Sequence, residues 1–293
     1  MNERVVLIGS PHSLFAAATY DGIRDALKGG LNFTFLGVIA TSPYVRRRFE
    51  RAVSLVRQSA ARVLNPEWPF CTARLSIPAK DIAVVSENIN DPSFVTYIRD
   101  TLKPSVTISV SNHQILKDAV IEQLGYIVNY HDSLLPEYGG VSSTEFAHYY
   151  SEPFSGYTFH KIADAGIDTG NIITSGSIPQ GNTGPQERVV KTRILRTVIP
   201  AVLERLFSRE EGTPQYGTGS YFNRNELRRL TGIDDADSTA EVQRRIEAFG
   251  SVRVNSLPVT RIAPLGDTVF RIERINYMPV FRKRVVTLGS GGI

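Results

Sequence analysis

The sequence predicts an α/β fold with a doubly wound, mostly parallel sheet, followed by a small C-terminal domain of α+β or mainly β structure. Short apolar runs alternate with helical patterns over residues 4–206, as expected of parallel strands joined by crossover helices. The composition changes at Glu210-Glu211-Gly212-Thr213-Pro214, where a linker is expected. Beyond this segment, short strand-like runs follow one another closely, which is typical of an antiparallel sheet.

The boundaries of several elements follow from local signals. Residues 5–8 form an uninterrupted apolar run, typical of a strand buried on both faces, and Gly29-Gly30 can end the helix that follows. Asn90-Asp91-Pro92 can cap a helix, with the proline in its first turn. The predicted strands are 5–8, 33–40, 82–85, 106–110, 125–129, 156–162 and 172–178. The predicted helices are 14–27, 43–64, 92–102, 114–124, 141–150 and 185–206.

We expect a domain boundary near residue 210, which divides the chain into residues 1–209 and residues 210–293. The C-terminal part is expected to contain one helix and four strands, at 239–249, 252–254, 259–262, 269–275 and 280–286. The predicted helix 43–64 carries six arginines between apolar residues. We interpret these arginines as a solvated face, with binding of substrate phosphates as the alternative.

Composition excludes several classes of protein. Cys71 is the only cysteine, so the chain has no internal disulfide and no thiolate cluster for zinc or iron–sulfur. The net charge of +4 favours anionic ligands but falls short of a dedicated nucleic-acid binder. Gly9-Ser10-Pro11 lacks the later glycines of the dinucleotide fingerprint, which argues against a nicotinamide dehydrogenase. With neither a membrane span nor a secretory signal in the sequence, we expect a cytoplasmic protein without membrane association.

The first candidate for chemistry is the segment Asn129-Tyr130-His131-Asp132-Ser133-Leu134-Leu135-Pro136, at the end of a predicted strand. Side chains two apart on a strand share a face, so Asn129 and His131 are expected to point the same way. The carboxyl ends of parallel strands border the ligand crevice of an open sheet, where this pair would lie. An isolated Asn-x-His pair is commonly a loop contact, so the spacing alone does not make it catalytic.

The second candidate is the turn-rich segment Asp164-Ala165-Gly166-Ile167-Asp168-Thr169-Gly170-Asn171. Its glycines allow the backbone to approach a flat ligand closely, and Asp168 could hold a histidine in its working tautomer. Asp-Thr-Gly also occurs in aspartic proteases. The chain has no second copy of this tripeptide, and its α/β pattern does not fit that all-β fold.

Together these elements resemble the folate-dependent formyltransferase family, which includes methionyl-tRNA formyltransferase, glycinamide ribonucleotide formyltransferase and the sugar N-formyltransferases. The family's Asn-x-His-x-Ser-Leu-Leu-Pro motif is intact at residues 129–136, and residues 166–173 match its Asp-containing loop. Further matching segments follow in the family's order, at residues 7–11, 88–92, 114–116 and 158–162. The resemblance covers about residues 4–180 and implies a Rossmann-like catalytic domain that uses 10-formyltetrahydrofolate as formyl donor.

The resemblance also implies residue roles. Asn129 and protonated His131 would donate hydrogen bonds to the oxyanion formed when an amine attacks the formyl carbon. Asp168 would orient His131 and help to remove the amine proton, without a metal. The pterin would bind mostly to main-chain groups of two segments, whose members are Gln114, Ile115 and Leu116, and Asp164, Ala165, Gly166 and Ile167.

The acceptor is less constrained. Residues 41–79 lack the glycine-rich basic loop of the tRNA-acting members, so we favour a small amine, such as an aminodeoxysugar nucleotide or a natural-product intermediate, over tRNA. The alternatives are methionyl-tRNA formyltransferase, formyltetrahydrofolate hydrolase and a non-enzymatic folate-binding module. We expect His113 to cap a helix, with a changed folate pocket as the alternative. We expect His12, His148 and His160 to be mostly structural, because their spacing does not suit a metal.

Overall fold

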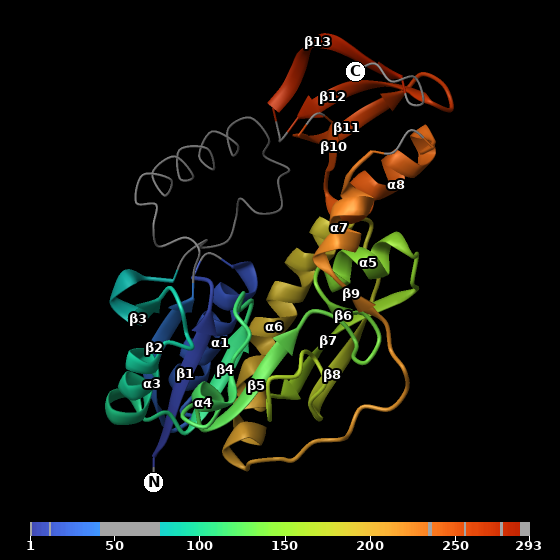
Figure 1. The fold of residues 1–293 in the computed structure, drawn as a ribbon. Helices are drawn as coiled ribbons and strands as arrows, with labels where there is room; N and C mark the ends of the chain where they lie inside the picture. The colour runs from blue at the N-terminus through green and yellow to red at the C-terminus, as the bar shows by residue number, and fades with distance from the viewer. Residues whose placement is uncertain are drawn as a thin grey trace.

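The computed structural model describes residues 2–11, 13–41, 77–233, 236–254, 256–275 and 278–287. A seven-stranded sheet forms the larger part, with strand order β3-β2-β1-β4-β5-β7-β8 (Figure 1). Its strands are β1 (Glu3–Gly9), β2 (Phe33–Thr41), β3 (Ile82–Ser86), β4 (Val106–Val110), β5 (Tyr126–His131), β7 (Phe154–Lys161) and β8 (Ile172–Pro179). The first five strands of this order pair in parallel, and β7 and β8 are antiparallel to their neighbours. The predicted mostly parallel α/β fold is confirmed.

Helices cover both faces of this sheet. On one face lie α1 (Leu14–Lys28) and α6 (Gly184–Phe207), and on the other lie α3 (Pro92–Tyr97), the π-helical turn η3 (Ile98–Leu102) and α4 (Asp118–Ile121). A short turn, η2 (Ala79–Asp81), precedes β3. Val5 and Leu7 belong to the core under α1 and α6, whereas Val6 and Ile8 belong to the core under α3 and α4. Burial on both faces explains why this strand is an unbroken apolar run.

Helix starts follow the capping signals. The Ser13 side chain accepts a hydrogen bond from the Ala16 amide, and Asp91 accepts one from Ser93. The predicted helix 114–124 is wrong in its first half, because only Asp118–Ile121 is helical. The predicted helix 43–64 lies outside the described residues, as does His12.

Side-chain hydrogen bonds to the backbone explain why residues 114–117 are not helical. Gln114 Oε1 accepts from the Ile89 amide at 2.8 Å, and Gln114 Nε2 donates to the Glu87 carbonyl at 3.1 Å. Asn112 bonds both the amide and the carbonyl of Gln114, which holds the segment as a turn. His113 is exposed and does not cap α4, which begins after Lys117, so the capping expectation was wrong.

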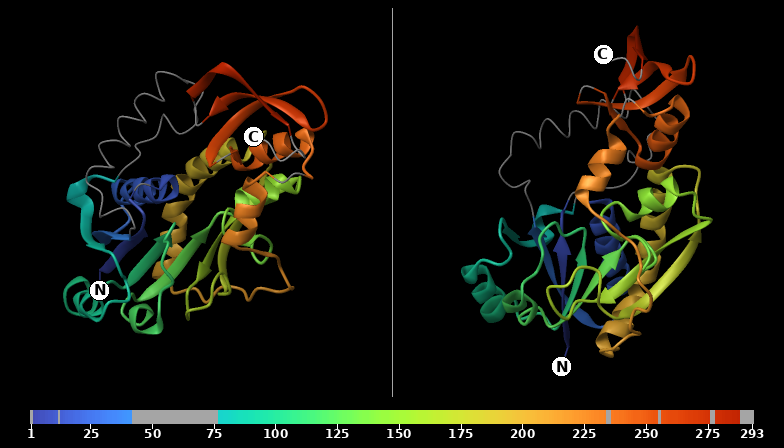
Figure 2. Two further views of the ribbon diagram at one scale, coloured as in Figure 1. Left: turned by 45° about the horizontal axis from the view of Figure 1, so that its top comes forward. Right: turned by 45° about the vertical axis from the view of Figure 1, so that its right-hand side comes forward.

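The C-terminal part is a four-stranded antiparallel sheet against one helix, at one end of the molecule (Figure 2). The strands are β10 (Val252–Val254), β11 (Leu257–Pro264), β12 (Val269–Ile275) and β13 (Met278–Thr287), and the helix is α8 (Thr239–Phe249). Val242 and Ile246 of α8 pack with Val259 and Phe270 in a core separate from those of the large sheet. The predicted small sheet is confirmed.

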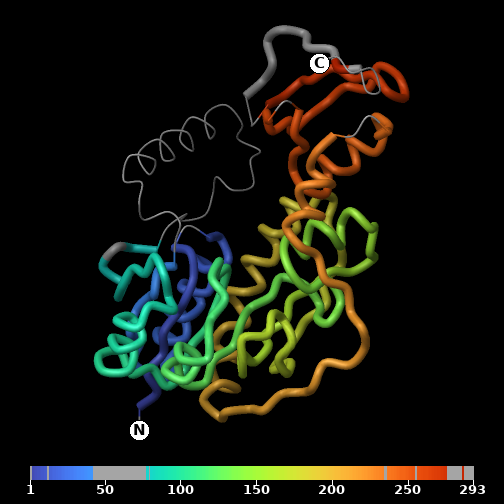
Figure 3. The backbone as a smooth tube through the Cα atoms, in the orientation of Figure 1, coloured from blue at the N-terminus to red at the C-terminus, as the bar shows by residue number. Residues whose placement is uncertain are grey.

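The segment between the two sheets returns to the large one. Thr213 forms an antiparallel bridge with Ile172, and both of its hydrogen bonds are 2.8 Å long. The strand β9 (Tyr221–Phe222) then pairs in parallel with β6 (Gly139–Gly140), and α7 (Arg224–Thr231) follows. The tube in Figure 3 shows this path from the end of α6, past β8, to α7.

An aromatic stack anchors the end of this segment. The ring of Phe222 stacks on Phe146 of α5 (Ser143–Tyr149), with centroids 4.1 Å apart and planes inclined by 15°. It also stacks on Tyr138, at 5.5 Å and 22°. Because Tyr138 immediately precedes β6, the chain after residue 210 helps to hold the end of the Asn-x-His motif.

Candidate active site

The candidate site lies where β5 ends, beside β7 and the loop that follows it. The side chains of Val128 and Tyr130 enter the core under α1 and α6. Asn129 and His131 approach instead the side chains of His160 and Asp168. The alternation of the strand therefore brings the two predicted residues to one face.

Asp168 reaches this cluster from a strained position. Its φ of 56° is in the left-handed region, which is uncommon for a residue with a side chain. Asp168 Oδ2 accepts a hydrogen bond of 2.9 Å from the Gly140 amide and lies 3.6 Å from His131 Nδ1. The three predicted catalytic residues thus converge, and Asp168 contacts His131 at ion-pair rather than hydrogen-bond distance.

The surroundings of Asp168 stabilise its ionised form. Burial alone would raise the pKa of this carboxyl, whose side chain is 10% exposed. The hydrogen bond from His160, the charge of His131 and the Gly140 amide oppose burial and leave the pKa below its ordinary value. At neutral pH Asp168 is therefore an anion between two imidazole rings.

His160 belongs to the same cluster, which the sequence interpretation as a structural histidine did not anticipate. It lies on β7 directly opposite Asn129 of β5. Its Nε2 is 3.4 Å from Asp168 Oδ1 and 3.1 Å from Asn129 Nδ2. The signal that could have found it is cross-strand pairing. The pairing of His160 with Asn129 can be predicted only once β7 is known to run antiparallel to β5.

His131 is fixed on its other side by the turn that follows β5. Its Nε2 lies 2.8 Å from the Tyr138 carbonyl and 3.0 Å from Ser143 Oγ at the start of α5. Ser133 Oγ donates to the same carbonyl at 2.9 Å, so the turn closes on itself. Both ring nitrogens of His131 face oxygen atoms, which limits rotation of the ring.

The two predicted pterin-binding segments differ in what they expose. Leu116 is buried in the core under α3 and α4, and the Ile115 carbonyl accepts a hydrogen bond from Asn90. The Ile115 side chain, in contrast, is 57% exposed.

In the second segment, Ala165, Gly166 and Ile167 are exposed. Asp164 Oδ1 accepts from the Gly166 amide at 2.7 Å. A Cβ on Gly166 would lie 2.4 Å from Thr169 Oγ1, so only glycine fits this turn as it stands. The loop therefore offers bare backbone with an apolar Ile167 beside it, as a flat heterocycle requires.

A second buried polar cluster lies behind the first and was also missed. Lys191 of α6 donates to the Asp132 carbonyl at 2.6 Å, to Thr144 Oγ1 at 2.8 Å and to Ser155 Oγ at 2.6 Å. Its Nζ also lies 3.2 Å from Glu187 Oε1. Burial would raise the pKa of the Asp132 carboxyl, but the charges of Arg188 and Lys191 outweigh burial and lower it.

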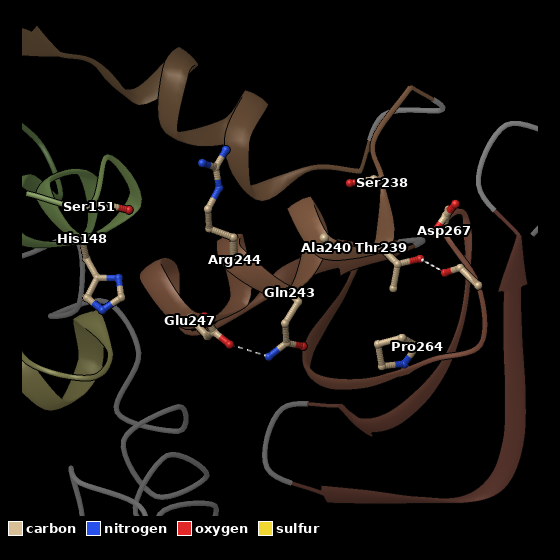
Figure 4. Close-up of a pocket in the computed structure, with 11 residues that line it drawn as sticks. His148, Ser151, Ser238, Thr239, Ala240, Gln243, Arg244, Glu247, Pro264 and Asp267 are labelled. Atoms are coloured by element: carbon tan, nitrogen blue, oxygen red, sulfur yellow. Dashed lines mark hydrogen bonds between the residues drawn. The ribbon is translucent and has the colours of Figure 1, made fainter.

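Two cavities of the described residues lie elsewhere. One of about 710 Å³ is bordered by α5, α8 and the turn between β11 and β12 (Figure 4). The charge of Arg244 in this cavity is already paired, because the guanidinium lies over the Tyr149 ring and forms an ion pair with Glu241. This cavity contains none of the residues of the Asn129 cluster.

Two further properties concern the part of the chain that the structure describes. Within it, no three His, Cys, Asp or Glu side chains are arranged to hold a metal ion. None of its helices combines the length and apolar character that a membrane span requires.

Comparison with known sequences gives consistent matches. The sequence profile of the formyl transferase family matches residues 3–193. A methionyl-tRNA formyltransferase of Chloroflexus aggregans is 36% identical over 187 residues, which cover 62% of this chain and 52% of that protein. One of Borrelia garinii subsp. bavariensis is 30% identical over 213 residues, which cover 71% and 65%. The chain thus spans about half to just under two thirds of the length of these relatives.

Solved structures with the same fold include an N-formyltransferase from Helicobacter canadensis, in complex with folinic acid and dTDP-3-aminofucose. It is 18% identical, with a TM-score of 0.60 over 98% of this chain and 99% of that chain. HypX from Aquifex aeolicus, in complex with tetrahydrofolic acid, is 14% identical, with a TM-score of 0.56 over 93% of this chain and 42% of that chain.

Proposed function

The chain belongs to the formyl transferase family, and from this premise we propose that it transfers a formyl group from 10-formyltetrahydrofolate to the amine of a small molecule. The observation that carries the proposal is the convergence of Asn129, His131 and Asp168 at the end of β5. These residues supply the donors and the base that acyl transfer to an amine requires.

The folate donor supplies the formyl carbon and a nitrogen leaving group. In the proposed reaction the acceptor nitrogen forms a bond to the formyl carbon, and negative charge develops on the formyl oxygen. Asn129 donates a hydrogen bond to that oxygen. The positive charge of protonated His131, whose ring nitrogens face Asp168 and the Tyr138 carbonyl, stabilises the negative charge electrostatically. Asp168 holds His131 and helps to take the proton that the amine loses. When the oxygen re-forms its double bond, the bond from carbon to the leaving nitrogen breaks and that nitrogen recovers a proton.

The exposed backbone of residues 164–167 and the exposed Ile115 support a pterin site in the proposed position. The folinic acid in the Helicobacter canadensis protein and the tetrahydrofolic acid in HypX are consistent with this donor. Calorimetric titration of the full chain with 5-formyltetrahydrofolate tests it. An absence of binding would remove the donor assignment.

A small acceptor is favoured by the fold match to a protein bound to dTDP-3-aminofucose, which extends over nearly the whole of both chains. The second candidate is methionyl-tRNA, which the curated relatives favour through their sequence identity. Parallel assays with aminodeoxysugar nucleotides and initiator methionyl-tRNA distinguish the two. Formate release without any amine would identify a hydrolase instead.

Replacing Asn129 tests the site itself. Asn129→Ala is expected to lower kcat by about 10² to 10³, the usual loss of one oxyanion donor, with little change in KM. Folate binding by calorimetry should be retained. Asn225→Ala removes the same amide from an exposed position of α7 and should leave kcat unchanged. Near-normal turnover of Asn129→Ala at saturating donor would contradict the assigned role.

A further inference from the structure

We infer that Tyr138 is a positioning residue, whose backbone carbonyl fixes the nitrogen that carries the permanent proton of His131, and that Glu152 in turn holds Tyr138. This inference rests on the proposed function, because it concerns the orientation of a catalytic residue of that reaction. Neither Tyr138 nor Glu152 need touch the substrate.

The Tyr138 carbonyl decides where His131 is protonated. A carbonyl oxygen can only accept a hydrogen bond, and His131 Nε2 lies 2.8 Å from this one. Nε2 therefore carries a proton, whether the ring is neutral or charged. The Ser143 hydroxyl, 3.0 Å from Nε2, can accept from the same proton. Nδ1, which lies 3.6 Å from Asp168 Oδ2, is left as the nitrogen that gains or loses a proton during the reaction.

Tyr138 presents this carbonyl from a strained backbone. Its φ of 59° is in the left-handed region, and such a conformation persists in a residue with a side chain only where the surroundings hold it. The peptide groups on both sides are held. The Tyr138 amide donates to Ser220 Oγ at 3.0 Å, and Ser133 Oγ donates to the Tyr138 carbonyl at 2.9 Å. Loss of an anchor would let the turn relax and move the carbonyl away from the ring.

The side chain of Tyr138 adds two further anchors. Its hydroxyl donates to Glu152 Oε1 at 2.6 Å, and its ring stacks on Phe222. Burial and the Glu152 carboxylate raise the pKa of the hydroxyl, which therefore stays a donor at neutral pH. Glu152 is tied back to α5, because its amide donates to the Ala147 carbonyl at 3.1 Å. A carboxylate outside the catalytic cluster is thus linked to the ring of His131 through one side chain.

Removal of the hydroxyl tests this link. Tyr138→Phe retains the ring and its stack on Phe222 but removes the donor to Glu152. We expect kcat to fall about 5- to 10-fold with little change in KM, as for the loss of one hydrogen bond that orients a catalytic group. Glu152→Ala should give the same loss, and the double variant should lose no more than either single one. Glu152→Gln retains an acceptor oxygen and should keep most of the activity of the wild type.

Tyr150→Phe is the matched control, because the exposed Tyr150 hydroxyl forms no hydrogen bond with the residues that the structure describes. It should leave kcat unchanged. Losses that add up in the double variant, or equal kcat values for Tyr138→Phe and Tyr150→Phe, would overturn the role of Tyr138 and Glu152.

A spectroscopic measurement on the unaltered protein tests the proton on His131 without turnover. In the full chain labelled with ¹⁵N-histidine, the ring nitrogens of His131 are assigned by comparison with His131→Gln. We expect Nε2 to carry a proton at every pH at which the chain is folded, and an unprotonated Nε2 would overturn the inference. If Nε2 is protonated but no amine is formylated in any assay, the proposed function fails and the constraint on His131 remains.

Discussion

Two buried polar clusters are built on consecutive residues at the end of β5. His131 faces the cluster of Asp168 and His160, whereas Asp132 takes part in the cluster around Lys191. The Lys191 ammonium has four oxygen neighbours between 2.6 and 3.2 Å. The Asp168 carboxylate has one close donor at 2.9 Å and two imidazole nitrogens at 3.4 and 3.6 Å.

The difference indicates that the Lys191 cluster is structural and that the Asp168 cluster takes part in the reaction. Every proton of the Lys191 ammonium is used, so this cluster can only fasten α6 to β5 and α5. The two contacts of Asp168 with imidazole nitrogens are long, and its backbone is strained, so the carboxylate can approach either ring more closely when a proton moves.

The largest effect is expected for Asp168→Asn. The neutral amide offers no negative charge to His131 or His160, so turnover should fall by about 10² to 10⁴, the range for general acid–base groups. Steady-state rates at saturating donor measure this loss. Asp118→Asn, at an exposed position of α4, is the control. If Asp164→Asn loses activity and Asp168→Asn does not, the two carboxylates have exchanged roles.

Lys191→Met should show the opposite pattern. It leaves the Asp132 and Glu187 carboxylates buried beside a neutral chain, which typically costs about 3 to 5 kcal/mol of unfolding free energy. The KM for the amine should change little in the folded protein. Urea denaturation of the variant measures the cost, with the exposed Lys117→Met as control. Unchanged stability with reduced kcat would mean that Lys191 takes part in the reaction, and it would contradict the structural role of its cluster.

A smaller effect is expected from Gln215, which lies in the segment after α6. Its Nε2 donates to the carbonyls of Asp168 and Gly170, both at 2.8 Å. Each hydrogen bond contributes about 1 kcal/mol. Gln215→Ala should therefore loosen the loop and lower kcat about 10-fold, while Gln123→Ala serves as the control. Unaltered kinetics would mean that the loop holds its strained conformation without this contact.

The smallest effect concerns pH. The pKa of Asp168 is lowered in the folded protein, so its ionised form binds protons less readily there than in the unfolded chain. The resulting stability is fully present above the unfolded value of about 3.9 and is lost as the pH falls through the folded value. The difference in unfolding free energy between wild type and Asp168→Asn should therefore shrink below about pH 4. A difference that grows on acidification would contradict the ion-pair assignment.

The sequence predicted most strands because an apolar run such as residues 5–8 is buried whichever helices cover it. Asn129 and His131 could be paired because alternation along one strand is a local property. The partner strand of β5 is not local, so the contact of Asn129 with His160 could not be predicted. The burial of Lys191 could not be predicted for a related reason. A glutamate and a lysine four residues apart on a helix, such as Glu187 and Lys191, commonly form an exposed ion pair.

The contacts of the segment after residue 210 could not be predicted either, because they are not local in the sequence. A change of composition near residue 210 predicted a boundary, and the two-residue strand β9 is too short to leave a pattern. Its pairing with β6 and the stack of Phe222 on Phe146 are visible only in three dimensions. The boundary near residue 210 remains a prediction, and Gln215 and Phe222 contact residues of the candidate site whichever domain they are assigned to.

This segment has a consequence for the order in which the protein matures. Asn129, His131 and Asp168 leave the ribosome before Gln215 and Phe222 do. A nascent chain that ends within α6 can contain every strand of the large sheet, but it lacks the clamp on the Asp168 carbonyl. The large sheet can therefore assemble during synthesis, whereas the reactive geometry is completed only when the chain beyond residue 222 has folded back.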